Sequence, residues 1–381
     1  MKNEGKVIRK LCTALGHPDL ASNLTDSAWR DIQPILIKVM RERVLKSKST
    51  DLLREYESRM DLYGVSKTNS CLLHTLIEHF NRVVQNKYEV VELSPISPMG
   101  LNSLLTEISQ DITLSSIRQS EVVSDPTTPL ALHCAHLRKK MIPNKEKIGD
   151  PVHLATSTKV LRLQKFDQSK GYLQHFKLLG LCSGGRNGKD YFFGIKYLTD
   201  HISTWLDFVQ SLQENGYCFE NIQVKLSDVR LIEAIIQHHK LDRDKINLHS
   251  LDDDFDLFES FGIRLPKEIP KVDSISDKMI AQNGLFDFIK NLRLLEDNMI
   301  IFLKAKYPNV TFSIDLNRKA GLGYYKDYCY HIFATNLEGR EVQLADGGST
   351  DWLTKLLSSE KEHMVTSGFG AELVHNLFNI S

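Results

Sequence analysis

The sequence predicts an α+β fold: a mostly antiparallel sheet flanked by helices, with an N-terminal helical extension and a small α/β inset. Two patterns predict it. Strand-like segments cluster in 151–196 and again in 310–346, without the regular alternation of strand and helix that a doubly wound parallel sheet requires. Elsewhere, apolar residues recur every three to four positions, which is typical of helices with one buried face.

The composition excludes several classes of protein. The chain has 381 residues with 48 basic and 48 acidic side chains, so its formal net charge is zero, which argues against bulk electrostatic capture of nucleic acid or an anionic membrane. No apolar run approaches the ~18 residues of a membrane span, and the charged N-terminus lacks the apolar stretch of a signal peptide. Six scattered cysteines without a CxxC pair predict reduced thiols and a cytoplasmic location.

The elements follow in order along the chain. Residues 1–65 are polar and helical, and they form the predicted extension. A helix with a wide apolar stripe begins near residue 72, and the β-branched run 88–93 follows as a strand that we expect to end near Pro95, because proline cannot donate to a sheet ladder. Single cores stop growing at about 250–300 residues, so we expect more than one packed unit.

The second half of the chain completes the predicted core. Residues 199–214 form a helix with apolar residues on one face, and 221–275 read as a strand, a helix and a polar stretch, the predicted inset. A long helix over 276–306 leads into the final strands and a last helix. The predicted core is therefore 66–220 together with 276–381.

The stretch SDPTTP is the first candidate for chemistry. It places Asp125, Thr127 and Thr128 on a proline-bounded turn, and a carboxylate beside hydroxyls suits the capture of an ammonium group. The same pattern is typical of a helix N-cap with an early proline. The residues alone leave both interpretations open.

The stretch AGLGYYKDYCYHIF is the second candidate, because it places a glycine-containing turn before a predicted strand. Successive strand residues face opposite sides. We therefore expect one of Tyr324 and Tyr325 to line a pocket and the other to pack in the core.

No metal site is predicted. His133 and His136 have HxxH spacing, but neither a second ligand pair nor a helical glutamate accompanies them, so we expect them to be core or surface histidines. The basic cluster 138–147 is expected to be a solvated loop and not a nucleic-acid surface.

Taken in order, these segments resemble the catalytic core of class II aminoacyl-tRNA synthetases, most of all the histidyl branch and its paralogue, the regulatory subunit of short-form ATP phosphoribosyltransferase. LIEHFNRVVQNKYEVVELSP looks like the family's first motif, a helix and strand that build the dimer interface. The resemblance therefore implies a homodimer through 72–95. SDPTTPLAL resembles the stretch whose acidic residue and threonine hold the substrate α-amino group, which implies that role for Asp125 and Thr127.

The remaining motifs follow in the family's order. VLRLQKFDQSKGYLQHFKLLGL looks like the second motif, with Arg162 at the arginine that meets the ATP α-phosphate and Gln174 at the second arginine of its loop. AGLGYYKDYCYHIF is similar to the R-G-L-D-Y-Y signature of the histidine pocket, which implies that Tyr324 and Tyr325 bind the substrate. ADGG and SGFGAEL are similar to the third motif.

The departures from the family concern its charged residues. Ala320 and Gly323 replace the arginine and aspartate of R-G-L-D-Y-Y, and His375 lies where the ATP-binding arginine of the third motif belongs. Adenylate formation joins two anions, so fixed guanidinium groups must offset their repulsion, and each lost donor typically costs ~10²–10³-fold in rate. We therefore expect no catalytic residue and no cofactor, with ATP as the open alternative if Arg318, Lys319 or Lys326 supplies the missing charge.

Three functions remain open. We favour a non-catalytic synthetase-like protein that binds a histidine-like amino acid or related small ligand and acts as a regulatory or partner subunit of another enzyme, because the ammonium-binding side is the better preserved. The second is an amino-acid-activating ligase with a non-tRNA acceptor, or a histidine–tRNA ligase-like enzyme, which Arg162 motivates. The third is a structural dimeric scaffold. Because the chain ends soon after His375, we expect no anticodon-binding domain.

Overall fold

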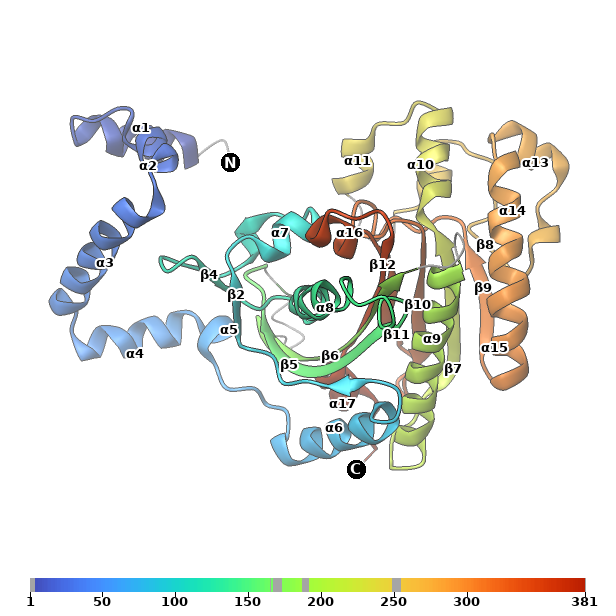
Figure 1. Cartoon of the computed structure of the whole chain (residues 1–381). Helices are drawn as coiled ribbons and strands as arrows, with labels where there is room; N and C mark the ends of the chain where they lie inside the picture. Colours follow the sequence, from blue (N-terminus) through green and yellow to red (C-terminus); the bar gives the residue numbers. More distant parts are fainter. Residues whose placement is uncertain (1–3, 165, 167–172, 187–191, 249–254, 381) are drawn as a thin grey trace.

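A computed structural model describes residues 4–164, 166, 173–186, 192–248 and 255–380. Helices cover both faces of one large sheet, and a helical arm leads away from this body at the N-terminal end (Figure 1). The predicted α+β fold with a mostly antiparallel sheet is confirmed.

The central sheet has nine strands. Neighbouring strands run antiparallel, except that β1 is parallel to β5 and β7 is parallel to β9. In spatial order the strands are β1 (Glu89–Val90), β5 (Val152–Leu161), β6 (His175–Arg186), β12 (Glu362–Phe369), β11 (Glu341–Thr350), β10 (Tyr328–Thr335), β7 (Glu220–Asp228), β9 (Thr311–Asp315) and β8 (Glu268–Ile269). A small second sheet has the order β2 (Ile96–Pro98), β4 (Ser120–Val122) and β3 (Ser115–Ser116).

Strand β6 shows how the two faces are divided, because side chains alternate along a strand. Leu179 and Leu181 join the cluster that contains α9, whereas Gly180 and Cys182 face α8. The helices on the α8 face are α7 (Leu101–Thr106), α8 (Thr127–Met141) and α16 (Trp352–Leu357), and those on the α9 face are α6 (Ser70–Val84), α9 (Phe192–Gln213) and α17 (Ala371–Phe378).

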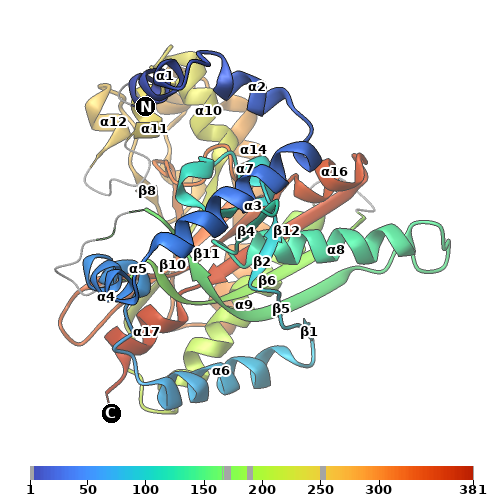
Figure 2. The same ribbon diagram turned by 90° about the vertical axis from the view of Figure 1, so that its left-hand side faces the viewer.

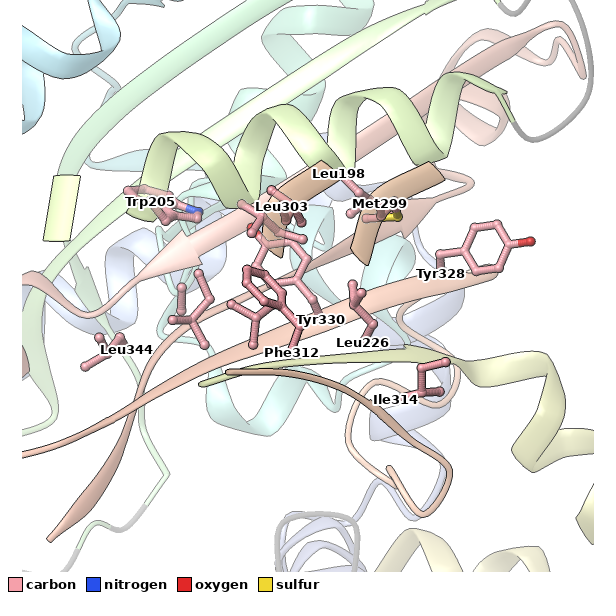
Figure 3. Packing of buried hydrophobic residues seen from close by; sticks show 14 of the residues in the cluster. Leu198, Trp205, Leu226, Met299, Leu303, Phe312, Ile314, Tyr328, Tyr330 and Leu344 are labelled. Atoms are coloured by element: carbon pink, nitrogen blue, oxygen red, sulfur yellow. The ribbon is translucent and has the colours of Figure 1, made fainter. Parts of the chain in front are cut away.

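The larger core lies between α9 and the sheet (Figure 3). The apolar face predicted for α9 is buried, and Trp205 is the largest side chain on it. Its ring stacks between Phe80 of α6, at 5.6 Å, and Phe369 of β12, at 5.2 Å between centroids. Stacking of this kind adds about 0.5–1.5 kcal/mol to the burial of the rings, so α6, α9 and β12 are held together at one point.

On the opposite face, α8 approaches the sheet closely because β6 carries glycines beneath it. A Cβ at Gly180 would lie 3.1 Å from Cβ of Pro126, and one at Gly184 would collide with Sγ of Cys134. Two larger residues at these positions would lift α8 off the sheet, so the glycines of LLGLCSGG set the depth of this helix.

The strands β7, β9 and β8 extend the sheet beyond β10, and helices pack against this end. The helix predicted over 276–306 is interrupted, because Gly284 adopts a φ of +67° and separates two helices. β7 bonds to β10 and β9 within the large sheet, and the boundaries of the inset at 221–275 stay a prediction. The helices are α10 (Val229–His238), α11 (Arg243–Leu248), α12 (Leu257–Ser260), α13 (Asp277–Gln282), α14 (Phe286–Leu295) and α15 (Ile301–Lys306), with a π-helical turn η4 (Glu296–Ile300) and 3₁₀ turns η1 (Gln110–Ile112) and η3 (Val272–Ser274).

The N-terminal residues are helical, as predicted, and they form an arm beside the body (Figures 1 and 2). Its helices are α1 (Glu4–Ala14), α2 (Leu20–Asp26), α3 (Trp29–Lys46), α4 (Ser49–Ser58) and α5 (Met60–Tyr63). Across the described ranges of the chain, no helix combines the length and apolar character needed to cross a bilayer.

Two local predictions were wrong. The strand expected over 88–93 is only two residues long, and the chain forms a second short strand, β2, directly after Pro95, with Pro98 on the edge strand of the small sheet, where proline is tolerated. Arg138 does not belong to a solvated loop. Its side chain is completely buried, because Glu362 accepts from its Nε at 2.9 Å and the carbonyls of Ile148 and Asp150 accept from its Nη atoms.

The buried pair of Arg138 and Glu362 generates a prediction about stability. Glu362→Gln removes the counter-charge of Arg138 and also that of Arg186, whose Nε donates to Oε1 of Glu362 at 2.7 Å, and breaking a buried pair typically costs about 3–5 kcal/mol. We expect urea denaturation followed by circular dichroism to show a loss of this size. Glu42→Gln is the matched control, because Glu42 faces Lys38 on the exposed surface of α3 and its loss should cost under about 1 kcal/mol. Equal losses in both variants would contradict the assignment.

A chain of buried polar groups links α9 to the sheet and predicts a pH dependence. The His201 ring forms hydrogen bonds with the hydroxyl groups of Ser183 and Ser367, both at 2.9 Å. Burial lowers the pKa of His201 to about 3. The unfolded chain takes up a proton at His201 near pH 6.5 and the folded chain does not, so the unfolded state binds more protons between these two values. The free energy of unfolding should therefore fall as the pH drops from about 6.5 toward 3, by at most about 1.4 kcal/mol per pH unit for this group.

Denaturation curves at several pH values test this dependence. His201→Gln should make the slope shallower between pH 6.5 and 4, whereas His74→Gln, at an exposed position of α6, should leave it unchanged. An unchanged slope in His201→Gln would refute the prediction.

Candidate functional site

The predicted site residues come from three places that meet at the N-terminal end of α8. Asp125 and Thr127 lie at the start of this helix, Arg162 follows the end of β5, and Tyr324 lies in the turn before β10. The structure joins these four side chains by hydrogen bonds and one ion pair.

The carboxylate of Asp125 organises the start of α8. Its Oδ1 accepts the backbone N–H of Thr127 at 2.8 Å and the hydroxyl of Thr127 at 2.5 Å. This is the geometry of an acidic side chain at a helix N-terminus, where free N–H groups and the helix dipole favour a negative charge. Asp125 therefore stabilises the first turn of α8, in keeping with the capping interpretation of SDPTTP, and its role toward an ammonium group stays a prediction.

Tyr324 extends this chain of hydrogen bonds. Because the only hydroxyl proton of Thr127 goes to Asp125, the tyrosine hydroxyl donates to Oγ1 of Thr127, at 3.0 Å. Burial and the nearby charge of Asp125 raise the pKa of Tyr324 well above its ordinary value, so it remains a donor at neutral pH. Its ring packs on Trp352 of α16, with centroids 5.0 Å apart.

Arg162 lies against Asp125 from the other side. Its Nε donates to the carbonyl of Ser124 at 2.8 Å, and its Nη2 lies 3.4 Å from Oδ2 of Asp125. The guanidinium also stacks over the ring of Phe176, 5.5 Å from its centroid. About a quarter of the Arg162 side chain stays exposed.

Gln174 supports the loop that carries Arg162. Its buried side-chain amide donates to the carbonyls of Leu163 and Gln164, both at 3.0 Å. Its backbone N–H donates to the carbonyl of Asp61 in α5, so the N-terminal arm touches this loop. A role of Gln174 in ligand binding stays a prediction. Residues 165 and 167–172 of the same loop lie outside the described part of the chain.

The tyrosine pair departs from the prediction. Tyr324 and Tyr325 precede β10, which begins at Tyr328, and they lie in a turn in which Gly321 accepts both of their N–H groups. The rule that strand residues face opposite sides does not apply there, and both rings lie together, with centroids 4.8 Å apart. Both are mostly buried. The sequence pattern identified the pair correctly as neighbours of the site but assigned it to the wrong element.

The two glycines of ADGG leave room for the rings of Tyr325 and Tyr330. The ring of Tyr325 lies on the backbone of Gly348, where a Cβ would collide with it, and the ring of Tyr330 fills the corresponding space at Gly347 on the other face of β11. Larger residues in this strand would displace both rings.

Arg318 is one of the three cations named above as alternative sources of positive charge. It lies two positions before Ala320, and its guanidinium is buried over the ring of Tyr325 at 5.4 Å. Nη2 donates to Oδ1 of Asp346 in β11 at 2.7 Å, whereas Nη1 is buried without a hydrogen-bond partner among the described residues. Its position among the basic residues around AGLGYYKDYCYHIF, and not the motif itself, is the sequence signal that points to it.

Asp346 and His331 complete this second cluster. Burial opposes a charge on Asp346, but Arg318 and then His331 hold the pKa of Asp346 below its ordinary value. Burial and the charge of Arg318 lower the pKa of His331, so this imidazole is neutral near pH 7. The cluster thus contains one ion pair and one neutral histidine.

The other candidate cations and ligands lie elsewhere. Lys319 donates to the carbonyl of Phe255, and His375 is buried with its Nδ1 bonded to the hydroxyl of Tyr217 at 2.8 Å. His133 and His136 lie on α8 at the rim of a mostly apolar cavity of about 600 Å³, which the Asp125 cluster does not line. Within the ranges that the structure describes, no group of three or more metal-ligating side chains is found.

The architecture and this cluster define the chain's fold as that of a class II synthetase-like core, in the form found in histidyl-tRNA synthetases and ATP phosphoribosyltransferase regulatory subunits. No protein-family model and no curated protein sequence matches the chain. The likeness is therefore one of structure, at low sequence identity.

Three solved structures illustrate it. An ATP phosphoribosyltransferase regulatory subunit/histidyl-tRNA synthetase from Bacillus halodurans has a TM-score of 0.60 at 12% identity, covering 83% of this chain and 82% of its own. A histidyl-tRNA synthetase from a Nostoc species has a TM-score of 0.56 at 16% identity, covering 81% and 72%. A histidine–tRNA ligase subunit from Alicyclobacillus acidocaldarius has 0.55 at 13% identity, covering 82% and 95%.

The Arg318–Asp346 pair predicts a measurable loss of stability. Asp346→Asn removes the counter-charge of a guanidinium that is only 1% exposed, and because Asp346 is itself 36% exposed, we expect a loss of roughly 2 kcal/mol, below the range for fully buried pairs. Urea denaturation measures it. Asp273→Asn is the control, because Asp273 pairs with Arg293 on the surface and should cost under about 1 kcal/mol. A change in Asp346→Asn no larger than in the control would argue against a structural ion pair.

Proposed function

We propose that this chain is a non-catalytic synthetase-like protein that binds a histidine-like amino acid or a related small ligand and acts as a regulatory or partner subunit of another enzyme. One observation carries the proposal. Both guanidinium groups in the described part of the site are paired with carboxylates of the chain itself, Arg162 with Asp125 and Arg318 with Asp346.

This pairing favours binding over adenylate formation. An enzyme that joins a carboxylate to a triphosphate needs fixed positive charge in excess at the reacting groups. Here each positive charge is offset by a negative one, and His375, at the place of the third motif's arginine, is bonded to Tyr217. An amino acid carries one positive and one negative group, and a site of balanced charges suits such a zwitterion.

Each end of the ligand has a complementary group in this site. The ligand's ammonium group would bind beside Asp125, Thr127 and the hydroxyl of Tyr324, which are already linked to one another. The ligand's carboxylate would bind Arg162, whose side chain is partly exposed.

A partner role and a homodimer are part of the proposal. One of the similar structures is named as a regulatory subunit of ATP phosphoribosyltransferase, which supports a heteromeric partner enzyme for this chain. The homodimer through 72–95 is supported by exposed apolar side chains there, Leu72 on α6 and Val90 on the edge strand β1. All six cysteines are free, in keeping with a cytoplasmic location.

Isothermal titration calorimetry with histidine and, separately, with ATP tests the proposal. We expect binding of histidine and none of ATP. Asp125→Asn removes the charge that meets the ammonium group, so its affinity for histidine should fall at least about 10-fold. Asp287→Asn, at an exposed position of α14, is the control and should bind as the original chain does. Binding of ATP without binding of histidine would refute the proposal, and circular dichroism of both variants confirms that they are folded.

A second function, an amino-acid-activating ligase, is favoured by the position of Arg162, whose partly exposed side chain lies beside Asp125. Pyrophosphate exchange with a panel of amino acids tests it. Exchange with any one of them would establish activation, and a flat result throughout would remove this alternative. If neither ligand binds and Asp125→Asn changes nothing, a structural scaffold is the remaining function.

A further inference from the structure

The N-terminal arm exposes apolar surface out of proportion to its length. Of the 29 large hydrophobic side chains that are exposed among the described residues, 16 lie before residue 66. A segment that gathers so many exposed apolar side chains is typical of an interaction surface. Eight of them are on two helices, Ile35, Val39, Met40, Val44 and Leu45 on α3 and Leu52, Leu53 and Tyr56 on α4.

These two helices have opposite charge. α3 carries five basic and two acidic side chains, whereas α4 carries one basic and three acidic side chains. Helices of opposite charge attract each other, and their charges set the register of a pairing. The charges of α3 and α4 are therefore complementary and would favour packing of one helix against the other.

The geometry of the link keeps them apart within one chain. Ser47 and Lys48, the two residues between the helices, are both extended, with ψ angles of 150°. The helices therefore meet end to end at an elbow, which lies away from the body (Figure 1). Near the start of α3, Gln33 donates to the carbonyl of Ile117 in the body, and the exposed residues named above lie beyond it. α4 has ten residues, and isolated helices of that length are marginal in water.

We propose that the arm is a self-association surface, in which α3 of one copy packs against α4 of a second copy and the reverse contact closes the pair about a two-fold axis. A two-fold axis makes the contact self-complementary. It also brings the positive helix of each copy onto the negative helix of the other. The pairing buries exposed apolar side chains of α3 and α4. This surface is separate from the segment 72–95 and does not depend on the ligand site.

Reciprocal charge reversal in the full chain tests the inference by sedimentation. Variant A is Arg41→Glu with Arg43→Glu, which makes α3 negative, and variant B is Glu55→Lys with Glu57→Lys, which makes α4 positive. Each alone places like charges together at both contacts, so the dissociation constant should rise at least about 10-fold. An equimolar mixture of A and B restores opposite charges at both contacts and should associate as the original chain does.

The control and the contradicting outcomes are specific. Lys278→Glu with Lys304→Glu reverses two exposed charges on the body and should leave the assembly unchanged. If 72–95 forms a second interface, the original chain is larger than a dimer and variants A and B are reduced to dimers. The inference is wrong if the original chain is monomeric at about 50 μM, above the dissociation constants of ordinary stable dimers, if A and B associate normally, or if their mixture fails to recover.

Discussion

The close packing of α8 on the sheet is the constraint on which the rest of the structure depends. The helix is held at its C-terminal end by the ion pair between Arg138 and Glu362, its start lies directly on Gly180 of β6, and its middle lies on Gly184. A helix of 15 residues is about 22 Å long. The ion pair at the far end of α8 and the glycines beneath the helix therefore fix the positions of Asp125 and Thr127 at its start.

The candidate site is assembled from groups whose charges are balanced within the chain. Asp125 serves the N-terminus of α8 and Arg162 at the same time, and Asp346 serves Arg318. Buried charges are tolerated only when they are paired and hydrogen-bonded. A site built this way keeps its geometry without a ligand, but it has little uncompensated positive charge to offer a triphosphate.

Much of the fold was predictable because it depends on periodic patterns. The apolar face of α9, the helix at 70–84 and the mostly antiparallel sheet follow from spacings of three to four and of two residues, which reflect burial on one side. Asp125 and Thr127 were predictable as neighbours because they lie two residues apart in a proline-bounded turn. The element that carries Tyr324 and Tyr325 was not, because a turn held by the carbonyl of Gly321 has no periodicity to detect.

The sequence by itself determined the strand and helix content, the glycines under α8 and Tyr325, and the absence of arginine at positions 320 and 375, since all of these are local or compositional. Only the tertiary structure decided which charges meet. Arg138 reads as part of a solvated basic run, yet its partner Glu362 lies 224 positions away. Arg318 likewise reads as one cation among several until β11 brings Asp346 to it. The physical reason is that a sequence pattern indicates whether a residue is buried or exposed. Which charged residue becomes its partner depends on how strands that are distant in the sequence pair with one another.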